Sequence, residues 1–138
     1  MIKSRINAEG QEELFDIVRR KFVAATPEEK VRQAYICFLH QHLHIPLINI
    51  VVEKAIVYNK MLKRFDIMVY KQGVCKIIVE CKAEFVSLSK QTFFQAAMYN
   101  SQLQAEYIVL FNGREERVFK KIDEKYQVCE SLPLFSNL

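Results

Sequence analysis

The sequence contains no tryptophan and only three glycines and three prolines among its 138 residues. So little Gly and Pro argues against a disordered or linker-like chain. The purely apolar runs are only a few residues long, too short for a transmembrane helix. Residues 1–10 are polar and charged and lack the apolar core of a secretory signal. We therefore expect a soluble, cytoplasmic protein with no membrane partner.

Cysteine is scarce as well, and its spacing fits neither a Cys-x-x-Cys pair nor a dense disulfide framework. The four thiols are Cys37, Cys75, Cys81 and Cys129. Ten Phe and six Tyr supply apolar area, so a core needs no cross-link. At this length, with 51% hydrophobic residues, the chain is predicted to form one domain over residues 1–138.

The net charge of +4 is too small to indicate nucleic-acid binding by itself. Its placement is more informative, because residues 54–90 hold eight Lys and Arg against three acids. The segments before and after are close to neutral. A polyanionic partner, DNA above all, fits this pattern.

Helix signals occur at two places. Thr26-Pro27-Glu28-Glu29 is typical of a capping box, with Thr26 as N-cap and Glu29 reaching back to it. A helix is predicted from there to about residue 42, and a second from Ser89 to about residue 103. Residues 11–25 have no clean period and are predicted as a strand or a short helix at the edge.

Strand signals fill the rest. Residues 48–58, 65–70 and 74–83 predict a three-stranded meander, because they are rich in Ile, Val and aromatic residues and are separated by turn residues. Residues 107–111 predict a buried strand, and Asn112-Gly113 a tight turn into a hairpin strand at 117–122. One edge strand is expected after residue 126. The predicted fold is α/β, a mixed sheet flanked by helices.

Charged residues inside apolar strands are the strongest functional signal, because burying an unpaired carboxylate is costly. Asp66 interrupts one such strand, and Glu80 and Lys82 interrupt the next. Glu80 and Lys82 share one face of their strand, since side chains alternate.

Whether Asp66 joins them depends on the hairpin register. In an antiparallel pair of strands, the residue numbers of any two facing residues add up to the same total. That total is 146 if Asp66 faces Glu80. That register puts Lys71 opposite Cys75 and requires a three-residue loop. A two-residue loop at Gln72-Gly73 would instead pair Asp66 with Val79.

Two facing carboxylates repel each other unless a cation lies between them. Oxygen ligands suit Mg²⁺ or Mn²⁺, with Asp66 and Glu80 as the metal ligands. Lys82 would then position the attacking water or stabilise the developing negative charge. The alternative is a solvent-exposed strand face with ordinary Glu and Lys ion pairs.

Several motifs in order resemble the N-terminal nuclease domain of type I restriction enzyme motor subunits, in the PD-(D/E)xK superfamily. They are Thr26 to Gln33, Arg64-Phe65-Asp66-Ile67, Val79-Glu80-Cys81-Lys82-Ala83, Gln95-x-x-x-Tyr99-Asn100 and Asn112-Gly113, and the resemblance covers about residues 12–122. It implies a restriction-endonuclease-like core and a metal-dependent DNA-cleaving site at Asp66, Glu80 and Lys82. Gln95 and Tyr99 match an accessory pattern of these nucleases, and their spacing puts both on one helix face.

This chain departs from such motor subunits in having no P-loop and no target-recognition region. A motor or specificity subunit encoded elsewhere is therefore an expected partner. The expected function is a Mg²⁺-dependent deoxyribonuclease in restriction or repair, and the alternative is a catalytically silent DNA-binding or assembly module of the same fold.

Other charged residues have two interpretations each. Glu28 could add an acid to the site or only complement the helix dipole. Glu53 could bind metal or pair with Lys54 or Arg64. Arg64 and Lys90 could contact DNA phosphates, although a structural ion pair is favoured for Arg64.

The histidines and Cys81 are expected to be structural. His40, His42 and His44 straddle the end of the first predicted helix and do not share a face, so a dipole partner or a solvated cluster is expected. Cys81 is expected in the core, because alternation points it away from Glu80 and Lys82.

Overall fold

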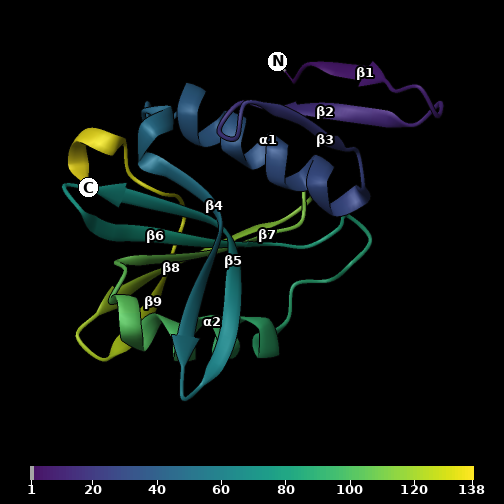
Figure 1. Cartoon of the computed structure of the whole chain (residues 1–138). Coiled ribbons are helices and arrows are strands. Elements are labelled where there is room, and N and C mark those ends of the chain that lie inside the picture. The colour runs from purple at the N-terminus through teal and green to yellow at the C-terminus, as the bar shows by residue number, and fades with distance from the viewer. Residues whose placement is uncertain (1) are drawn as a thin grey trace.

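The computed structural model describes residues 2–138, and it consists of two α-helices, nine strands and two short 3-10 turns (Figure 1). The helices are α1 (Pro27–Gln41) and α2 (Lys90–Leu103). The 3-10 turns are η1 (Leu47–Asn49) and η2 (Phe135–Asn137). The strands are β1 (Ser4–Ile6), β2 (Glu12–Asp16), β3 (Lys21–Ala24), β4 (Ile50–Tyr58), β5 (Met61–Lys71), β6 (Val74–Cys81), β7 (Tyr107–Phe111), β8 (Glu116–Ile122) and β9 (Lys125–Cys129).

The main sheet is mixed and has six strands in the order β4-β5-β6-β7-β8-β9. Only β6 and β7 run parallel, and α2 connects them; the other neighbours are antiparallel. One helix lies on each face of this sheet (Figure 1). The predicted order of helix, three strands, helix, strand and hairpin is confirmed, and so are the α/β class and the last edge strand.

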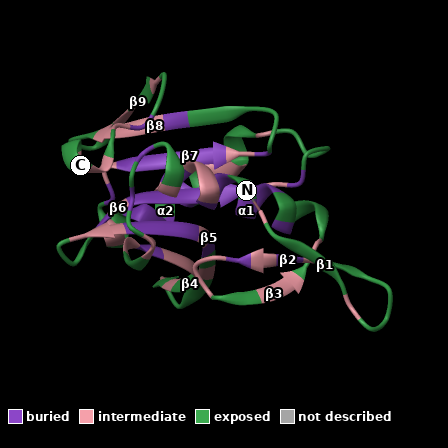
Figure 2. Ribbon diagram, turned by 90° about the horizontal axis from the view of Figure 1, so that it is seen from above, coloured by how far each residue is buried: buried purple, intermediate pink, exposed green. Residues whose placement is uncertain are grey.

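The main sheet separates two apolar clusters, one on each face. The α1-side cluster includes Val31, Tyr35, Ile36 and Leu39 of α1, and the α2-side cluster includes Ala96 and Tyr99 of α2. Strands β5, β6 and β7 are the most deeply buried (Figure 2), because they lie in the middle of the sheet between the two helices. Cys81 belongs to the α1-side cluster, so its expected place in the core is confirmed.

The first 25 residues form a separate three-stranded antiparallel sheet in the order β1-β2-β3. The strand interpretation of residues 11–25 is confirmed and the helix is excluded. The short strand β1 was not predicted, because its three residues are all exposed and carry no apolar alternation. Within the described residues 2–138, neither helix is long and apolar enough to cross a membrane.

The hairpin between β5 and β6 has an irregular register. Its turn is the two-residue Gln72-Gly73 type, with Lys71 opposite Val74, so the predicted three-residue loop and the pairing of Lys71 with Cys75 are wrong. The register then shifts, so that Val69 faces Ile77 and Ile67 faces Val79. The extra residue is Lys76, which forms a β-bulge. Beyond the bulge, facing residue numbers add up to 146, the register that places Asp66 opposite Glu80.

The bulge also changes which face each side chain takes. Cys75 packs in the α2-side cluster, whereas Ile77, two positions later, packs in the α1-side cluster. Residues two apart in a regular strand would share a face. The bulge therefore places Glu80 on the α2 side of the sheet, the side of Ile78.

Helix α1 begins as predicted, with half of the predicted capping box. The Thr26 hydroxyl accepts a hydrogen bond from the Glu29 N–H at 3.1 Å, and Pro27 occupies the first turn. Glu29 does not complete the box. Its carboxylate instead binds Arg32 and Gln33 on the same helix, because those donors lie one turn further along at 2.5–2.9 Å.

We expect Thr26→Ala to lower the free energy of unfolding by about 1 kcal/mol, because it removes the acceptor of one otherwise unpaired N–H at the helix start. Urea unfolding followed by circular dichroism would measure this. Thr26→Ser is the matched control, since it keeps the hydroxyl. An alanine variant with the same unfolding midpoint as the serine variant would show that the cap contributes nothing.

Candidate active site

Three acids lie side by side across three neighbouring strands. Val52, Ile67 and Val79 form one row of paired residues in β4, β5 and β6. The next position along each strand is occupied by an acid, and these are Glu53, Asp66 and Glu80. The fold therefore brings together two acids predicted as metal ligands and one predicted as accessory.

The backbone is irregular at this row of acids. Phe65 and Ile67 pack in opposite clusters although they are two apart, so side-chain alternation breaks at Asp66. Glu53, on the neighbouring strand, has a left-handed φ of 54°. A positive φ is unfavourable for a residue with a Cβ and is often found at functional sites. The acids thus occupy a point where the pleat of the sheet is interrupted.

Glu80 is buried, with 4% of its surface exposed. Its Oε2 lies 2.6 Å from Lys63 Nζ, and the Lys63 side chain is itself only 17% exposed. Its other oxygen, Oε1, is buried and has no hydrogen-bond partner among the described residues. An unsatisfied charged oxygen of this kind costs stability, so it calls for an explanation.

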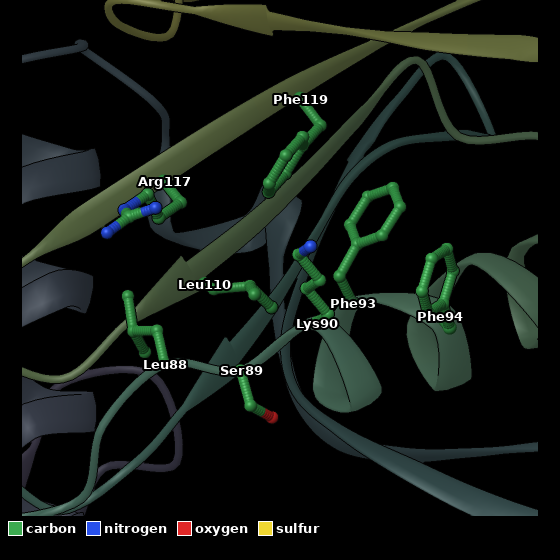
Figure 3. Close-up of a pocket in the computed structure, with 8 residues that line it drawn as sticks. All are labelled: Leu88, Ser89, Lys90, Phe93, Phe94, Leu110, Arg117 and Phe119. Atoms are coloured by element: carbon green, nitrogen blue, oxygen red, sulfur yellow. The ribbon is translucent and has the colours of Figure 1, made fainter.

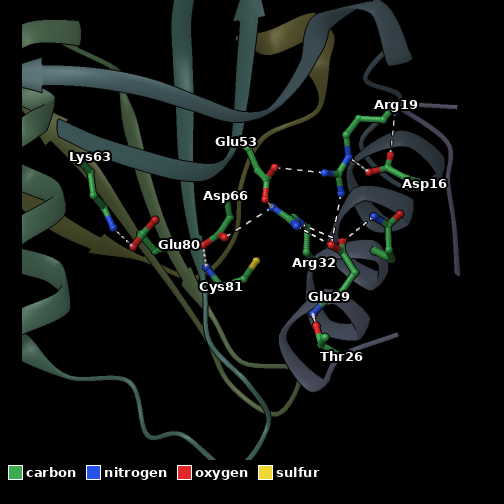
Figure 4. A network of polar contacts seen from close by, with 11 residues as sticks. Asp16, Arg19, Thr26, Glu29, Arg32, Glu53, Lys63, Asp66, Glu80 and Cys81 are labelled. Atoms are coloured by element: carbon green, nitrogen blue, oxygen red, sulfur yellow. Dashed lines mark hydrogen bonds and ion pairs between the residues drawn. The ribbon is translucent and has the colours of Figure 1, made fainter. Parts of the chain in front are cut away.

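Asp66 is held between the sheet and α1 (Figure 4). Its Oδ2 accepts a hydrogen bond from the Cys81 N–H at 2.7 Å, and its Oδ1 lies 3.8 Å from an Arg32 nitrogen. Burial, together with the charges of Glu80 and Glu28, raises the pKa of Asp66 to about 7, although the hydrogen bond from Cys81 and the charge of Arg32 act in the opposite direction. Asp66 therefore exchanges its proton near neutral pH.

Arg32 links the acids to α1 and to the N-terminal sheet. It makes two hydrogen bonds to Glu29, and one of its nitrogens lies 3.1 Å from Glu53. Arg19 also contacts Glu53 and Glu29, and it bonds to the buried Asp16. Burial disfavours the Arg32 cation, but the bond and charge of Glu29 outweigh it and keep the pKa above its ordinary value.

Glu53 is thus part of an arginine network. Its expected pairing with Lys54 or Arg64 is wrong, because the unusual backbone at Glu53 directs its carboxylate to Arg19 and Arg32 (Figure 4). Arg64 is exposed, and within residues 2–138 it makes no ion pair, so its favoured structural role is wrong as well. Its proposed contact with DNA stays a prediction.

Lys82 follows the last residue of β6. Its N–H donates to the Phe111 carbonyl at 2.9 Å, which extends the parallel pairing by one residue. Its side chain lines a hollow of about 500 Å³ together with Gln91 and Gln95 of α2. The structure therefore brings Lys82 and Gln95 together, while Asp66 and Glu80 are not among the described residues that line this hollow.

The remaining predicted residues take different positions. Tyr99 is buried in the α2-side cluster, with its ring centroid 6.5 Å from that of Phe65, so it does not share the hollow of Gln95. Glu28 is exposed in the first turn of α1, where its charge acts on Asp66. Lys90 is exposed at the first residue of α2. Among residues 2–138, no group of three or more acids, histidines or cysteines is arranged to hold a metal ion.

The histidines lie away from these acids, at the end of α1. His40 Nδ1 is 2.8 Å from the Ile45 carbonyl, and the His42 ring stacks on Phe38. His44 is exposed with a φ of 60°. His40 and His42 therefore have different partners.

Arg19, Arg32 and Lys63, the three cations that contact the acids, were not singled out from the sequence. The signal for Arg32 was its place beside the apolar stripe of α1, three residues after Glu29, where a helix brings opposite charges together. Lys63 lies on β5, and its contact with Glu80 depends on long side chains crossing the strand pair. No short sequence pattern encodes that contact.

The family of this chain is shown by comparison with known proteins. A search among curated proteins finds no match. The family model described as "Type I restriction enzyme R protein N terminus" matches residues 27–133, from the start of α1 to beyond β9. The match includes the strands that carry Glu53, Asp66 and Glu80, and it confirms the resemblance seen in the sequence motifs. The chain therefore belongs to the family of type I restriction enzyme R protein N-terminal domains.

Proposed function

We propose that this chain is a metal-dependent DNA nuclease that hydrolyses phosphodiester bonds with Asp66, Glu80 and Lys82 on a restriction-endonuclease-like core. One observation carries the proposal: two carboxylates occupy adjacent positions on neighbouring strands, Glu80 buried and Asp66 largely buried, and burial with the charge of Glu80 raises the pKa of Asp66 to about 7. Such a pair costs folding stability. Strongly shifted groups of this kind are typical of functional sites.

The donor atoms fit a hard divalent cation such as Mg²⁺ or Mn²⁺. Glu80 Oε1 has no partner within the described chain, and Asp66 Oδ1 has only the 3.8 Å contact with Arg32. Mg²⁺ typically takes one or two protein carboxylates and keeps several waters, so Asp66 and Glu80 are enough to hold it. When bound, the ion supplies a Lewis acid that polarises the phosphodiester and activates water.

The chain's own groups have separate tasks in this proposal. Asp66 and Glu80 would hold the ion, and Asp66 can exchange a proton near neutral pH. Lys82 stabilises negative charge on the phosphoryl oxygens or positions the attacking water. Arg64, Lys90 and Gln95 are exposed and can contact the DNA backbone.

The family supports a role in restriction. Its members are the N-terminal part of the R protein of a type I restriction enzyme. We infer that DNA is the substrate and that motor or specificity subunits are partners of this domain.

We expect the wild-type chain to nick plasmid DNA with Mg²⁺ or Mn²⁺ and to lose this activity in EDTA. Lys82→Ala should lower the rate by about a hundredfold or more, the usual effect of losing one electrostatic or proton-transfer group. Gel electrophoresis of supercoiled plasmid measures the nicked product.

The matched control is Lys125→Ala. Lys125 lies by the Tyr107 end of β7, whereas Lys82 lies by the Phe111 end, so the two lysines are at opposite ends of the sheet. Equal loss in both variants would contradict a specific role for Lys82. Nicking that persists in EDTA would contradict the metal-dependent reaction.

A specific observation favours a second candidate, the silent DNA-binding or assembly module. Glu80 and Asp66 already have cationic neighbours in Lys63 and Arg32, which can neutralise them without a metal. Under that function the chain would bind DNA equally well with and without Mg²⁺, and Lys82→Ala would leave plasmid DNA uncut as the wild type does.

A further inference from the structure

One face of α2 is exposed and carries no negative charge. Lys90, Gln91, Phe94, Gln95 and Met98 are all exposed, and their spacing places them on one side of the helix. The helix contains no Asp or Glu, and Lys90 is its only charged residue. Phe94 is 65% exposed, which is unusual for so large an apolar ring.

Phe94 lies between two hollows. On one side it lines the hollow of about 500 Å³ that contains Lys82 and Gln95. On the other side it lines a groove of about 520 Å³ with Lys90, Arg117 and Phe119 (Figure 3). The two hollows adjoin at Phe94, and together, from Lys82 past α2 to Arg117 on β8, they are termed the track.

The ring of Phe94 is supported by a cluster of aromatic side chains. Phe93 packs edge-on against Phe94 at 5.7 Å between centroids. Phe93 in turn packs on Phe119 at 4.3 Å and on Tyr126 at 5.3 Å. The Phe94 ring therefore rests against a packed aromatic residue on one side, while most of its surface faces solvent.

The charge along the track suits a polyanion. None of the residues that line either hollow is acidic, whereas Lys82, Lys90 and Arg117 are basic. The other highly exposed aromatic residue, Phe85, has the opposite surroundings. Phe85 lines hollows that contain four acids, Glu28, Glu29, Glu84 and Glu115, against two basic residues, Arg32 and Arg114.

We propose that this track binds a single-stranded segment of DNA, with a base stacked on Phe94 and the backbone passing Lys82, Lys90 and Arg117. The inference rests on the proposed function for the identity of DNA as substrate. Single strands are preferred because stacking on a side chain needs an open base face, which duplex DNA hides. The two adjoining hollows would then guide one DNA strand toward Lys82.

The test measures binding in EDTA, so that it is independent of cleavage. Fluorescence anisotropy with a labelled oligothymidylate should give tighter binding than the same length of duplex. Phe94→Ala should weaken the oligothymidylate complex by about 5- to 150-fold, the range for losing one stacked base. Phe94→Trp should restore binding, and an oligonucleotide with abasic sites should bind both proteins equally.

Two sets of controls locate the effect. Phe85→Ala removes an even more exposed ring, which lies among acids, and should leave the affinity unchanged. Lys90→Ala and Arg117→Ala should each reduce the slope of log affinity against log salt by about 0.7, the contribution of one phosphate contact on a single strand.

Three outcomes would overturn the inference. They are preference for duplex DNA, equal losses for Phe94→Ala and Phe85→Ala, or an effect of Phe94→Ala on self-association in sedimentation but none on oligonucleotide binding. The last outcome would assign the groove to a second copy of this chain. Phe94-dependent binding without any cleavage would support the track and refute the nuclease, so the two proposals fail separately.

Discussion

Replacing Asp66 by asparagine is expected to lower DNA cleavage by about a thousandfold or more and to stabilise the folded protein at neutral pH. The loss follows from removing one of two carboxylates proposed to hold the metal, an interaction worth several kcal/mol in the transition state. The gain follows from removing a largely buried carboxylate whose ionised form is disfavoured by desolvation and by the charge of Glu80. Asparagine keeps an oxygen that can accept the Cys81 N–H.

The pH dependence of stability separates these effects. Asp66 has an ordinary pKa of 3.8, and in the folded protein its pKa is raised to about 7. Below about pH 4 it is protonated in both the folded and unfolded states. As the pH rises from about 4 to about 7, Asp66 ionises in the unfolded state but stays protonated in the folded state. Ionisation therefore stabilises the unfolded state alone, until Asp66 also ionises in the folded state near pH 7. The free energy of unfolding should therefore fall over this range, by an amount on the order of a few kcal/mol.

The measurement is urea unfolding of the wild type and Asp66→Asn in EDTA, between about pH 4 and pH 8. The difference between the two proteins isolates Asp66, because other carboxylates with lowered pKa, such as Asp16 and Glu29, contribute equally to both. Asp123→Asn is the control, since Asp123 is an exposed turn residue with a φ of 56° that asparagine accepts. A difference that stays constant with pH would contradict the raised pKa.

The second large effect is expected at Lys63. Lys63→Met should lower the free energy of unfolding by about 3–5 kcal/mol, because it leaves the Glu80 carboxylate buried without its cation. The double variant Lys63→Met with Glu80→Gln should recover most of this loss, since it removes the charge together with its partner. Urea unfolding at neutral pH measures all three proteins.

The control for Lys63 is an exposed ion pair in the same sheet. Lys120 lies 3.9 Å from Glu106, and both side chains are more than one-third exposed. Lys120→Met should cost less than about 1 kcal/mol, because water screens the pair. Similar losses at Lys63 and Lys120, or no recovery in the double variant, would show that burial of Glu80 does not make Lys63 structurally important.

The order of elements was predictable because its signals are local. Caps at Thr26 and Ser89 and the change from helical to alternating periodicity placed α1, α2 and the strands of the main sheet. The break between β5 and β6 at Gln72-Gly73 was also readable from its residue types, but the length of the loop was not. The bulge at Lys76 was not, because an extra residue in a strand depends on pairing with β5 and leaves no local pattern.

The site was predictable only as far as one strand pair. The charged residues within apolar strands identified Asp66, Glu80 and Lys82, and the register places the first two in adjacent positions. The partners of these acids come from elsewhere in the chain. Arg32 reaches Asp66 from α1, and the place of Tyr99 in the core depends on how α2 packs against the sheet. Sequence spacing carries no information on such contacts.

The bulge at Lys76 bears on how this hairpin tolerates insertions and deletions. Losing Lys76 would turn β5 and β6 into a regular ladder with the same partners, so Glu80 would stay beside Asp66. Losing one residue between Ile77 and Glu80 would instead rotate Glu80 and Lys82 into the α1-side core and bring Cys81 to the opposite face. The turn half of β6 can therefore lose one residue without moving Glu80 from Asp66, whereas the half that follows Ile77 cannot.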